Sequence, residues 1–296
     1  MKKPMYIVAV SGGIDSVVLL DALVAGRTIG GVDVWGEYPQ GELIVAHFDH
    51  GIRDDSAADE QFVRGLAAGY GLSYHARREE LGKAASEETA RHHRYAFLKT
   101  VQDQYNATLV TAHHANDAAE TIAINCQRGT GWRGVAVMDT PGVWRPLLSV
   151  VKREIYEYAK QYRTTWHEDS TNASGQYLRN RIRQQLTDDD MVWQLCALRA
   201  RQVELKRAID KESARRIGAP PYSRYFFSHC GDAVAIELLR ALCLREVGMS
   251  PTLPMRYRML HAIKVARAGT VLPITTGIWL SCTRTHFIVE TRQSVI

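Results

Sequence analysis

The 296-residue chain contains no run of 18 or more apolar residues, although 46% of its residues are hydrophobic. A helix needs about 20 consecutive apolar residues to cross a bilayer, so we expect a soluble protein without a membrane span. The apolar run that follows Met1-Lys2-Lys3-Pro4 ends at Val10 and is too short for a secretory signal. Both absences favour a cytoplasmic protein.

Cysteine is scarce as well. The chain has five cysteines, an odd number, and none of them forms a Cys-x-x-Cys pair. This pattern argues against a disulfide framework, a zinc ribbon and an iron–sulfur cluster. Isolated cysteines of this kind are expected to be small buried hydrophobic side chains.

The length predicts two folding units, which we place at residues 1–190 and 191–296. Charge is unevenly divided between them, with 21 Lys+Arg against 25 Asp+Glu in the first and 16 against 7 in the second. Thirteen of the 16 cations are arginines, which favour bidentate contacts with phosphate. The second unit is therefore expected to bind a polyanion, although a basic helical surface is an equal alternative.

Strand and helix patterns alternate through the first unit. Strands are predicted at 6–10, 43–48, 72–75 and 107–112, with helices after the first strand and at 57–70, 87–105 and 117–128. This alternation predicts an α/β class, with a Rossmann-like parallel sheet and right-handed crossovers. For the second unit, the sequence predicts a smaller, mainly helical α+β domain. Its predicted elements are a long basic helix that ends near Gly218, helices at 232–247 and 254–268, and strands at 270–274, 277–283 and 286–291.

The segment Ser11-Gly12-Gly13-Ile14-Asp15-Ser16 directly follows the first predicted strand. Its glycines allow a sharp turn and a close backbone approach, and unpaired N–H groups at the start of the next helix favour an anion such as phosphate. No Gly-Lys-Ser/Thr follows, so it is not the loop of nucleotide-hydrolysing P-loop proteins. Asp15 would repel phosphate unless a cation lies between, which makes it a candidate Mg²⁺ ligand. The alternative is an ordinary strand-to-helix turn.

A second polar cluster, His113-His114-Ala115-Asn116-Asp117, follows the fourth predicted strand. Asn116 is expected to cap the next helix, which puts Asp117 in its first turn. Because ligands bind beyond the carboxyl ends of parallel strands, this cluster and the loop at 11–16 are expected to share one site. The two histidines could bind phosphate, exchange protons or simply be satisfied polar residues in a turn. A zinc site is not expected, because no third ligand lies at helical spacing from the two histidines.

These motifs, taken in order, resemble those of the tRNA(Ile)-lysidine synthetases, and more closely the shorter members that lack a further C-terminal tRNA-binding domain. The loop at 11–16 is similar to the PP-loop of the ATP pyrophosphatases, which split ATP into AMP and pyrophosphate. The other matching segments are Asp49–Arg53, Glu88–Arg91 with Arg94-Tyr95, His113–Thr121, Arg128–Gly131, Arg145–Leu148, Asp169–Asn172 and Arg179–Arg183. The family usually has an acid where this chain has Asn116. Either Mg²⁺ affinity is lower here, or Asp15 and Asp117 suffice.

The resemblance implies a two-step ligation. ATP adenylates the 2-oxygen of the wobble cytidine of a CAU-anticodon tRNA(Ile), and the side-chain amine of L-lysine then displaces AMP to give lysidine. ATP and Mg²⁺ are the implied cofactors, with Ser11, Gly12, Gly13 and Ser16 around the pyrophosphate and Asp15 and Asp117 on the metal. The second unit would bind the tRNA, and the oligomeric state stays open, a dimer included.

The resemblance also implies the remaining site residues. Asp117, His113 and His114 are candidates for the general base, with Asp117 preferred. Arg94 is a further catalytic candidate, which could neutralise phosphate or bind tRNA. Glu88 or Glu120 could supply the counter-charge for the lysine amine, although each could equally be a solvated helix carboxylate. The other substrate-binding candidates are Arg53, Arg91, Arg128, Asn172, Arg179, Asn180 and Arg183.

Two other classes of protein remain as alternatives. A tRNA thiolase of the same superfamily generally uses paired cysteines, which this sequence lacks. A catalytically weak nucleotide- or RNA-binding protein has only Asn116 in its favour.

Overall fold

The computed structural model describes residues 3–51, 56–82, 86–167 and 178–292. The chain divides into two compact units, Met1–Val203 and Glu204–Ile296. The division falls within the long helix α7 (Asp189–Arg216), whereas the sequence places the boundary at residues 190 and 191.

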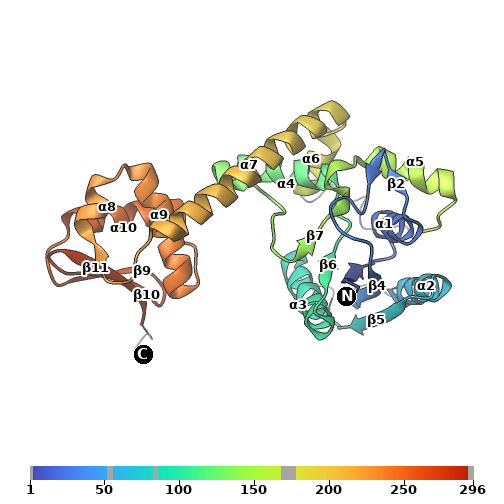
Figure 1. Ribbon diagram of the computed structural model, residues 1–296, viewed down its shortest axis with the longest axis horizontal. Coiled ribbons are helices and arrows are strands. Elements are labelled where there is room, and N and C mark those ends of the chain that lie inside the picture. The colour runs from blue at the N-terminus through green and yellow to red at the C-terminus, as the bar shows by residue number, and fades with distance from the viewer. Residues whose placement is uncertain (1–2, 52–55, 83–85, 168–177, 293–296) are drawn as a thin grey trace. The chain divides into compact units, whose positions relative to one another are not determined.

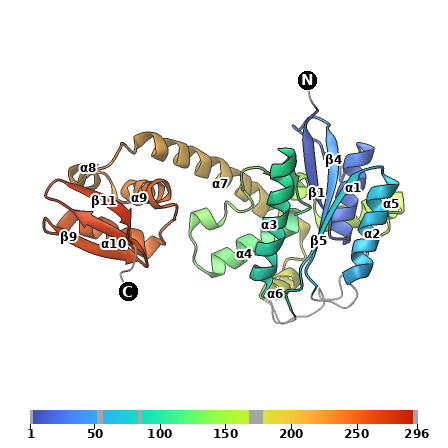
Figure 2. The same cartoon turned by 90° about the horizontal axis from the view of Figure 1, so that it is seen from below.

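The first unit contains a five-stranded parallel sheet (Figures 1 and 2). Its strands, in spatial order, are β5 (Ser73–Arg78), β4 (Glu42–Asp49), β1 (Met5–Ala9), β6 (Thr108–Val110) and β7 (Val143–Trp144). The Rossmann-like α/β fold expected from the sequence is confirmed. Two features were not anticipated: the two-residue strand β7, and the hairpin of β2 (Thr28–Ile29) with β3 (Val32–Asp33). Each of these strands is too short to show a period.

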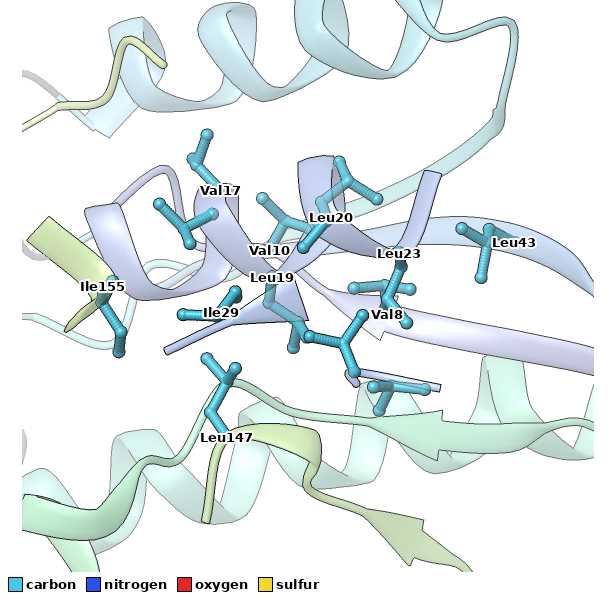
Figure 3. Packing of buried hydrophobic residues seen from close by; sticks show 14 of the residues in the cluster. Val8, Val10, Val17, Leu19, Leu20, Leu23, Ile29, Leu43, Leu147 and Ile155 are labelled. Carbon is cyan, nitrogen blue, oxygen red and sulfur yellow. The ribbon is translucent and has the colours of Figure 1, made fainter. Parts of the chain in front are cut away.

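Helices cover both faces of this sheet, as Figure 2 shows. One face packs against α1 (Ile14–Ala25), α2 (Ser56–Gly69) and α5 (Lys152–Tyr162), and the other packs against α3 (Glu87–Tyr105). Successive residues of β1 point to opposite faces, so Val8 joins the first layer and Ile7 packs with Phe97 in the second. Figure 3 shows side chains of β1, α1 and α5 meeting Leu147 in the first layer. Burial on both faces therefore holds the carboxyl end of β1, where the loop begins, in a rigid frame.

The remaining elements of this unit complete the carboxyl edge of the sheet. They are α4 (Ala115–Gln127), the short 3₁₀ helices η1 (Trp132–Gly134) and η2 (Pro146–Ser149), and α6 (Leu178–Gln185). The first part of α7 also packs here, because Val192 is buried in one cluster with Ala115, Ala119 and Val151.

The second unit packs helices on one face of a four-stranded antiparallel sheet. Its elements are β8 (Tyr222–Ser223), α8 (Arg224–His229), α9 (Asp232–Val247), α10 (Leu253–Val265), β9 (Thr270–Thr275), β10 (Ile278–Cys282) and β11 (His286–Thr291). Strand β10 alternates in burial, and its inward-facing Leu280 shares a core with Leu239, Leu242 and Phe287. The predicted helices and three strands are confirmed, whereas the short elements β8 and α8 were not anticipated.

Within the described residues, no helix is long and apolar enough to cross a membrane. Cysteine burial follows the expectation only in part. Cys243 and Cys282 are buried, and burial raises the pKa of the Cys243 thiol to about 12. Cys126 is exposed near the end of α4, so the expectation of burial is wrong there.

Candidate active site

The loop between β1 and α1 has the geometry of an anion-binding turn. Gly12 has a φ of +95°, a conformation that a side chain would strain, and Gly13 is the N-cap of α1. The Ser16 hydroxyl donates to the carbonyl oxygen of Gly13 at 2.9 Å and accepts from the N–H of Ser11 at 3.1 Å. These bonds close the loop, while the dipole of α1 favours negative charge in front of it.

The histidine cluster lies beside this loop. His114 is the N-cap of α4, and its N–H donates to Asp117 Oδ2 at 3.1 Å. The Nε2 atom of His114 is 3.6 Å from Asp117 Oδ2 and 3.8 Å from Asp15 Oδ1. The structure therefore brings the two predicted clusters together at the carboxyl edge of the sheet. The expectation that Asn116 caps α4 is wrong, because the helix begins two residues earlier than predicted, at Ala115, and its N-cap is His114.

His113 is neutral near pH 7. Burial lowers the pKa of His113 to about 4, against the attraction of the Asp117 carboxylate. Three guanidinium groups lower it further, those of Arg91, Arg94 and Arg145. The Nδ1 atom lies 2.9 Å from the Thr111 hydroxyl, which fixes the ring. His113 can therefore accept a proton or a hydrogen bond without losing a proton first.

Asp117 is ionised. Burial by itself would raise the pKa of Asp117, but the charge of His114 and the hydrogen bond from its N–H bring the pKa below the usual value. An ionised carboxylate beside the anion loop is suited to hold a cation or to accept a proton.

Glu120 joins α4 to α6. Its carboxylate is almost fully buried, and it accepts from Arg179 Nε at 3.1 Å and from Arg183 Nε at 2.7 Å. A buried carboxylate needs such partners, because leaving it unpaired is costly. Both oxygens are thus in use, and a lysine amine at Glu120 would compete with two arginines. The same pairing orients both guanidinium groups, each of which is partly exposed.

Lys152 is a residue of this site that the sequence patterns did not indicate. Its Nζ lies 2.5 Å from Asp15 Oδ1, and its backbone N–H donates to Asn116 Oδ1 at 2.8 Å. Neither contact follows from spacing, since Lys152 is 137 residues from Asp15 and 36 from Asn116. The Asn116 side chain therefore holds the start of α5 instead of capping α4.

The other predicted residues are distributed around this centre. Arg91 and Arg94 project from α3, with the ring of Tyr95 4.9 Å and 5.7 Å from their guanidinium carbons. Glu88 and Arg128 are exposed, and in the described parts of the chain no side-chain hydrogen bond or ion pair joins them to the other candidates. Three candidates lie outside the described residues: Arg53, Asn172 and the side chain of Asn180.

The oxygen donors fit a Mg²⁺ ion that is shared with substrate phosphates. Magnesium takes oxygen ligands and is commonly held by one or two carboxylates plus phosphate, which Asp15 and Asp117 could provide. Asn116 does not add a third oxygen ligand to Asp15 and Asp117, because its amide oxygen accepts from the N–H of Lys152. Among the residues that are described, no group of three or more His, Cys, Asp or Glu side chains could hold a metal alone.

A parallel sheet whose first strand ends in an anion loop at a helix N-terminus defines an α/β nucleotide-binding protein. Comparison with protein-family models matches residues 1–190 to the PP-loop domain. The chain belongs to this family, and the match supports the use of ATP.

Several curated relatives have the same name, tRNA(Ile)-lysidine synthase. The tRNA(Ile)-lysidine synthase of Ralstonia nicotianae is 36% identical over 189 residues, which cover 61% of this chain and 39% of the relative. The enzyme of the same name from Solibacter usitatus is 39% identical over 181 residues, covering 60% of this chain and 38% of the relative. The chain thus spans well under half the length of these relatives.

Among solved structures, the fold is similar to that of the U34-tRNA thiolase NcsA from Methanococcus maripaludis, which was determined with its [4Fe-4S] cluster. The TM-score is 0.53, over 74% of this chain and 75% of the thiolase, at 15% sequence identity. A likeness at this identity concerns the fold alone.

Proposed function

We propose that this chain is a cytoplasmic ATP-dependent ligase that joins L-lysine to C2 of the wobble cytidine of a CAU-anticodon tRNA(Ile), forming lysidine. One observation carries the proposal: Asp15 of the phosphate loop and Asp117 of α4 both lie within 3.8 Å of His114 Nε2. The ATP loop and the second cluster therefore belong to one site. The names of the lysidine synthase relatives support the choice of substrates.

In the first step, the 2-oxygen of the cytidine attacks the α-phosphorus of ATP, and the bond to pyrophosphate breaks. Such transfers depend mainly on positioning and on stabilising charge. The backbone N–H groups of Gly12 and Gly13, with the hydroxyls of Ser11 and Ser16, would hold the departing pyrophosphate at the positive end of α1. Mg²⁺ held by Asp15 and Asp117 would offset phosphate charge when bound.

In the second step, the side-chain amine of lysine attacks C2 and AMP leaves with the 2-oxygen. The amine must lose protons to end as a substituted nitrogen. Asp117 as a carboxylate and His113 as a neutral imidazole are both free to accept one near pH 7. We assign the general base to Asp117, because His114 links it to the phosphate loop.

The tRNA would be bound largely by positive charge. Residues 191–296 carry 16 Lys+Arg against 7 Asp+Glu, which favours a polyanion. Arg179 and Arg183, held by Glu120 near the site, would add phosphate contacts next to the reacting base.

The test is to incubate the protein with ATP, labelled L-lysine and an unmodified tRNA(Ile) transcript that carries the CAU anticodon. We expect label to enter the tRNA only when ATP is present, and none to enter a matched transcript with uridine at the wobble position. Sulfur incorporation without lysine would favour a thiolase instead. ATP binding without any covalent product would favour a nucleotide-binding protein.

A further inference from the structure

Lys152 lies at the edge of the phosphate loop, and neither the proposed chemistry nor the matched motifs use it. Its Nζ is 2.5 Å from Asp15 Oδ1, in the first turn of α1. About a third of each side chain is exposed, so a ligand in the loop could reach both groups. The ion pair therefore lies at the surface that a polyphosphate would approach.

The start of α5 is fixed in place by its backbone. The N–H of Lys152 donates to Asn116 Oδ1 at 2.8 Å, and the N–H of Val151 donates to Glu154 Oε2 at 2.9 Å. One residue earlier, the carbonyl oxygen of Val150 accepts from the N–H of Ala115 at 2.9 Å. Val150 and Val151 are fully buried. The Lys152 backbone is thus tied to the first turn of α4, whereas its side chain reaches Asp15, with Nζ 5.2 Å from the centre of the Tyr156 ring.

The charges around the phosphate loop give a reason for a lysine at position 152. The Asp15 carboxylate lies beside a loop that should receive several phosphate charges, and it would repel them if it were unpaired. An ammonium group at 2.5 Å offsets this repulsion in the free protein. A partly exposed ion pair is only weakly stabilising, so the ammonium can exchange one oxygen partner for another at little cost. Phosphate oxygens of ATP are the obvious alternative partners, because a lysine binds phosphate as a point charge.

We propose that Lys152 is a phosphate-binding residue of the ATP site. In the free protein its ammonium group pairs with Asp15, and when ATP binds it moves to an oxygen of the β- or γ-phosphate. This inference rests on the use of ATP in the proposed function, and it adds a residue of α5 to a site otherwise built from the β1–α1 and β6–α4 connections.

The test compares two nucleotides and two lysines of the same helix. The affinities of ATP and AMP are measured by calorimetry for the wild type, Lys152→Met, Lys152→Arg and the control Lys160→Met, which changes an exposed lysine later in α5. We expect Lys152→Met to weaken ATP binding by about 10- to 100-fold, the usual range for a lost hydrogen bond to a charged group. AMP binding should change less than about threefold, and Lys152→Arg and Lys160→Met should bind ATP nearly as the wild type does.

The results separate this inference from the proposed function. If the wild type binds ATP and Lys152→Met binds it equally well, the assignment of Lys152 is wrong. Equal weakening of ATP and AMP also contradicts it, because that result points to a structural role. A wild type that binds neither nucleotide overturns the proposed function and this assignment with it. Thermal unfolding of each variant checks the fold, and Lys152→Gln replaces the methionine variant if that one unfolds.

Discussion

Two nitrogen-bearing side chains lie next to Asp15 in the phosphate loop. The ammonium of Lys152 and the imidazole of His114 both face its Oδ1 atom, at 2.5 Å and 3.8 Å. The ammonium of Lys152 offsets the negative charge that this carboxylate brings to an anion-binding loop. This arrangement makes Asp15 the residue whose charge is most directly tied to ATP chemistry.

Replacing Asp15 by asparagine keeps the size of the side chain and removes its charge. We expect Asp15→Asn to abolish pyrophosphate release, because Mg²⁺ would lose one of its two proposed carboxylate ligands. Affinity for tRNA should stay within about threefold, since we expect arginines elsewhere in the chain to supply most of the tRNA contacts. A pyrophosphate-release assay and a filter-binding assay measure the two effects. If tRNA affinity falls together with turnover, Asp15 has a structural role instead.

The depressed pKa of His113 predicts a pH dependence of stability. The pKa is about 4 in the folded chain and 6.5 for the unperturbed side chain. Above pH 6.5 both states are neutral and His113 contributes no pH dependence. Between pH 6.5 and 4 the unfolded state binds a proton that the folded state does not, so stability falls as the pH is lowered.

The His113→Gln variant isolates this contribution. We expect its unfolding midpoint to drop less than that of the wild type between about pH 7.5 and pH 5. The transition is followed by the fluorescence of Trp35 and Trp144, which are buried in the same unit. Identical pH dependence in the two proteins would mean that His113 is not held neutral by the fold.

At the scale of the elements, the starts of three helices are joined by side chains. Lys152 at the start of α5 contacts Asp15 in the first turn of α1, and Asn116 in the first turn of α4 holds the N–H of Lys152. An aspartate at position 116 could accept the same hydrogen bond. The amide in this chain is therefore compatible with a role in positioning α5, without any role on a metal.

Two substitutions at position 116 test whether Asn116 positions α5. Asn116→Asp keeps an oxygen acceptor for the Lys152 N–H, so we expect ATP affinity and thermal stability close to those of the wild type. Asn116→Leu is nearly isosteric but leaves that N–H unpaired, which should cost about 1–3 kcal/mol of unfolding free energy and weaken ATP binding. Chemical denaturation and calorimetry measure both. A marked gain of Mg²⁺-dependent ATP affinity in Asn116→Asp would instead make position 116 a metal ligand.

The elements that periodicity could predict were the long ones. Strand β4 and helices such as α3 carry enough residues for a pattern, and Ser86, the N-cap of α3, accepts from the N–H of Thr89. Of the two-residue strands, β7 and β8 pair with the longer strands β6 and β11, whereas β2 and β3 pair with each other. None of them is long enough to show a period in the sequence. The loop at 11–16 could be predicted because adjacent residues build it. The Lys152–Asp15 pair could not, because the fold alone brings these residues together.

At the scale of the whole chain, the two units differ in fold and in charge. The first holds the phosphate loop and the histidine cluster on a parallel sheet buried on both faces. The second packs its own core, and basic residues dominate the last third of the sequence. We expect tRNA affinity to fall steeply with salt, whereas ATP affinity depends on the first unit and should change far less. Binding measured at two ionic strengths checks this, and equal salt dependence of both ligands would contradict it.

The most direct test of the central claim is the mass of the wobble nucleoside after reaction. A tRNA(Ile) transcript with the CAU anticodon is incubated with the protein, ATP and lysine, digested, and analysed by mass spectrometry. The proposed function predicts a cytidine heavier by one lysine less one water, formed with one AMP and one pyrophosphate. Unmodified cytidine at that position, in a protein that still binds ATP and tRNA, would contradict it.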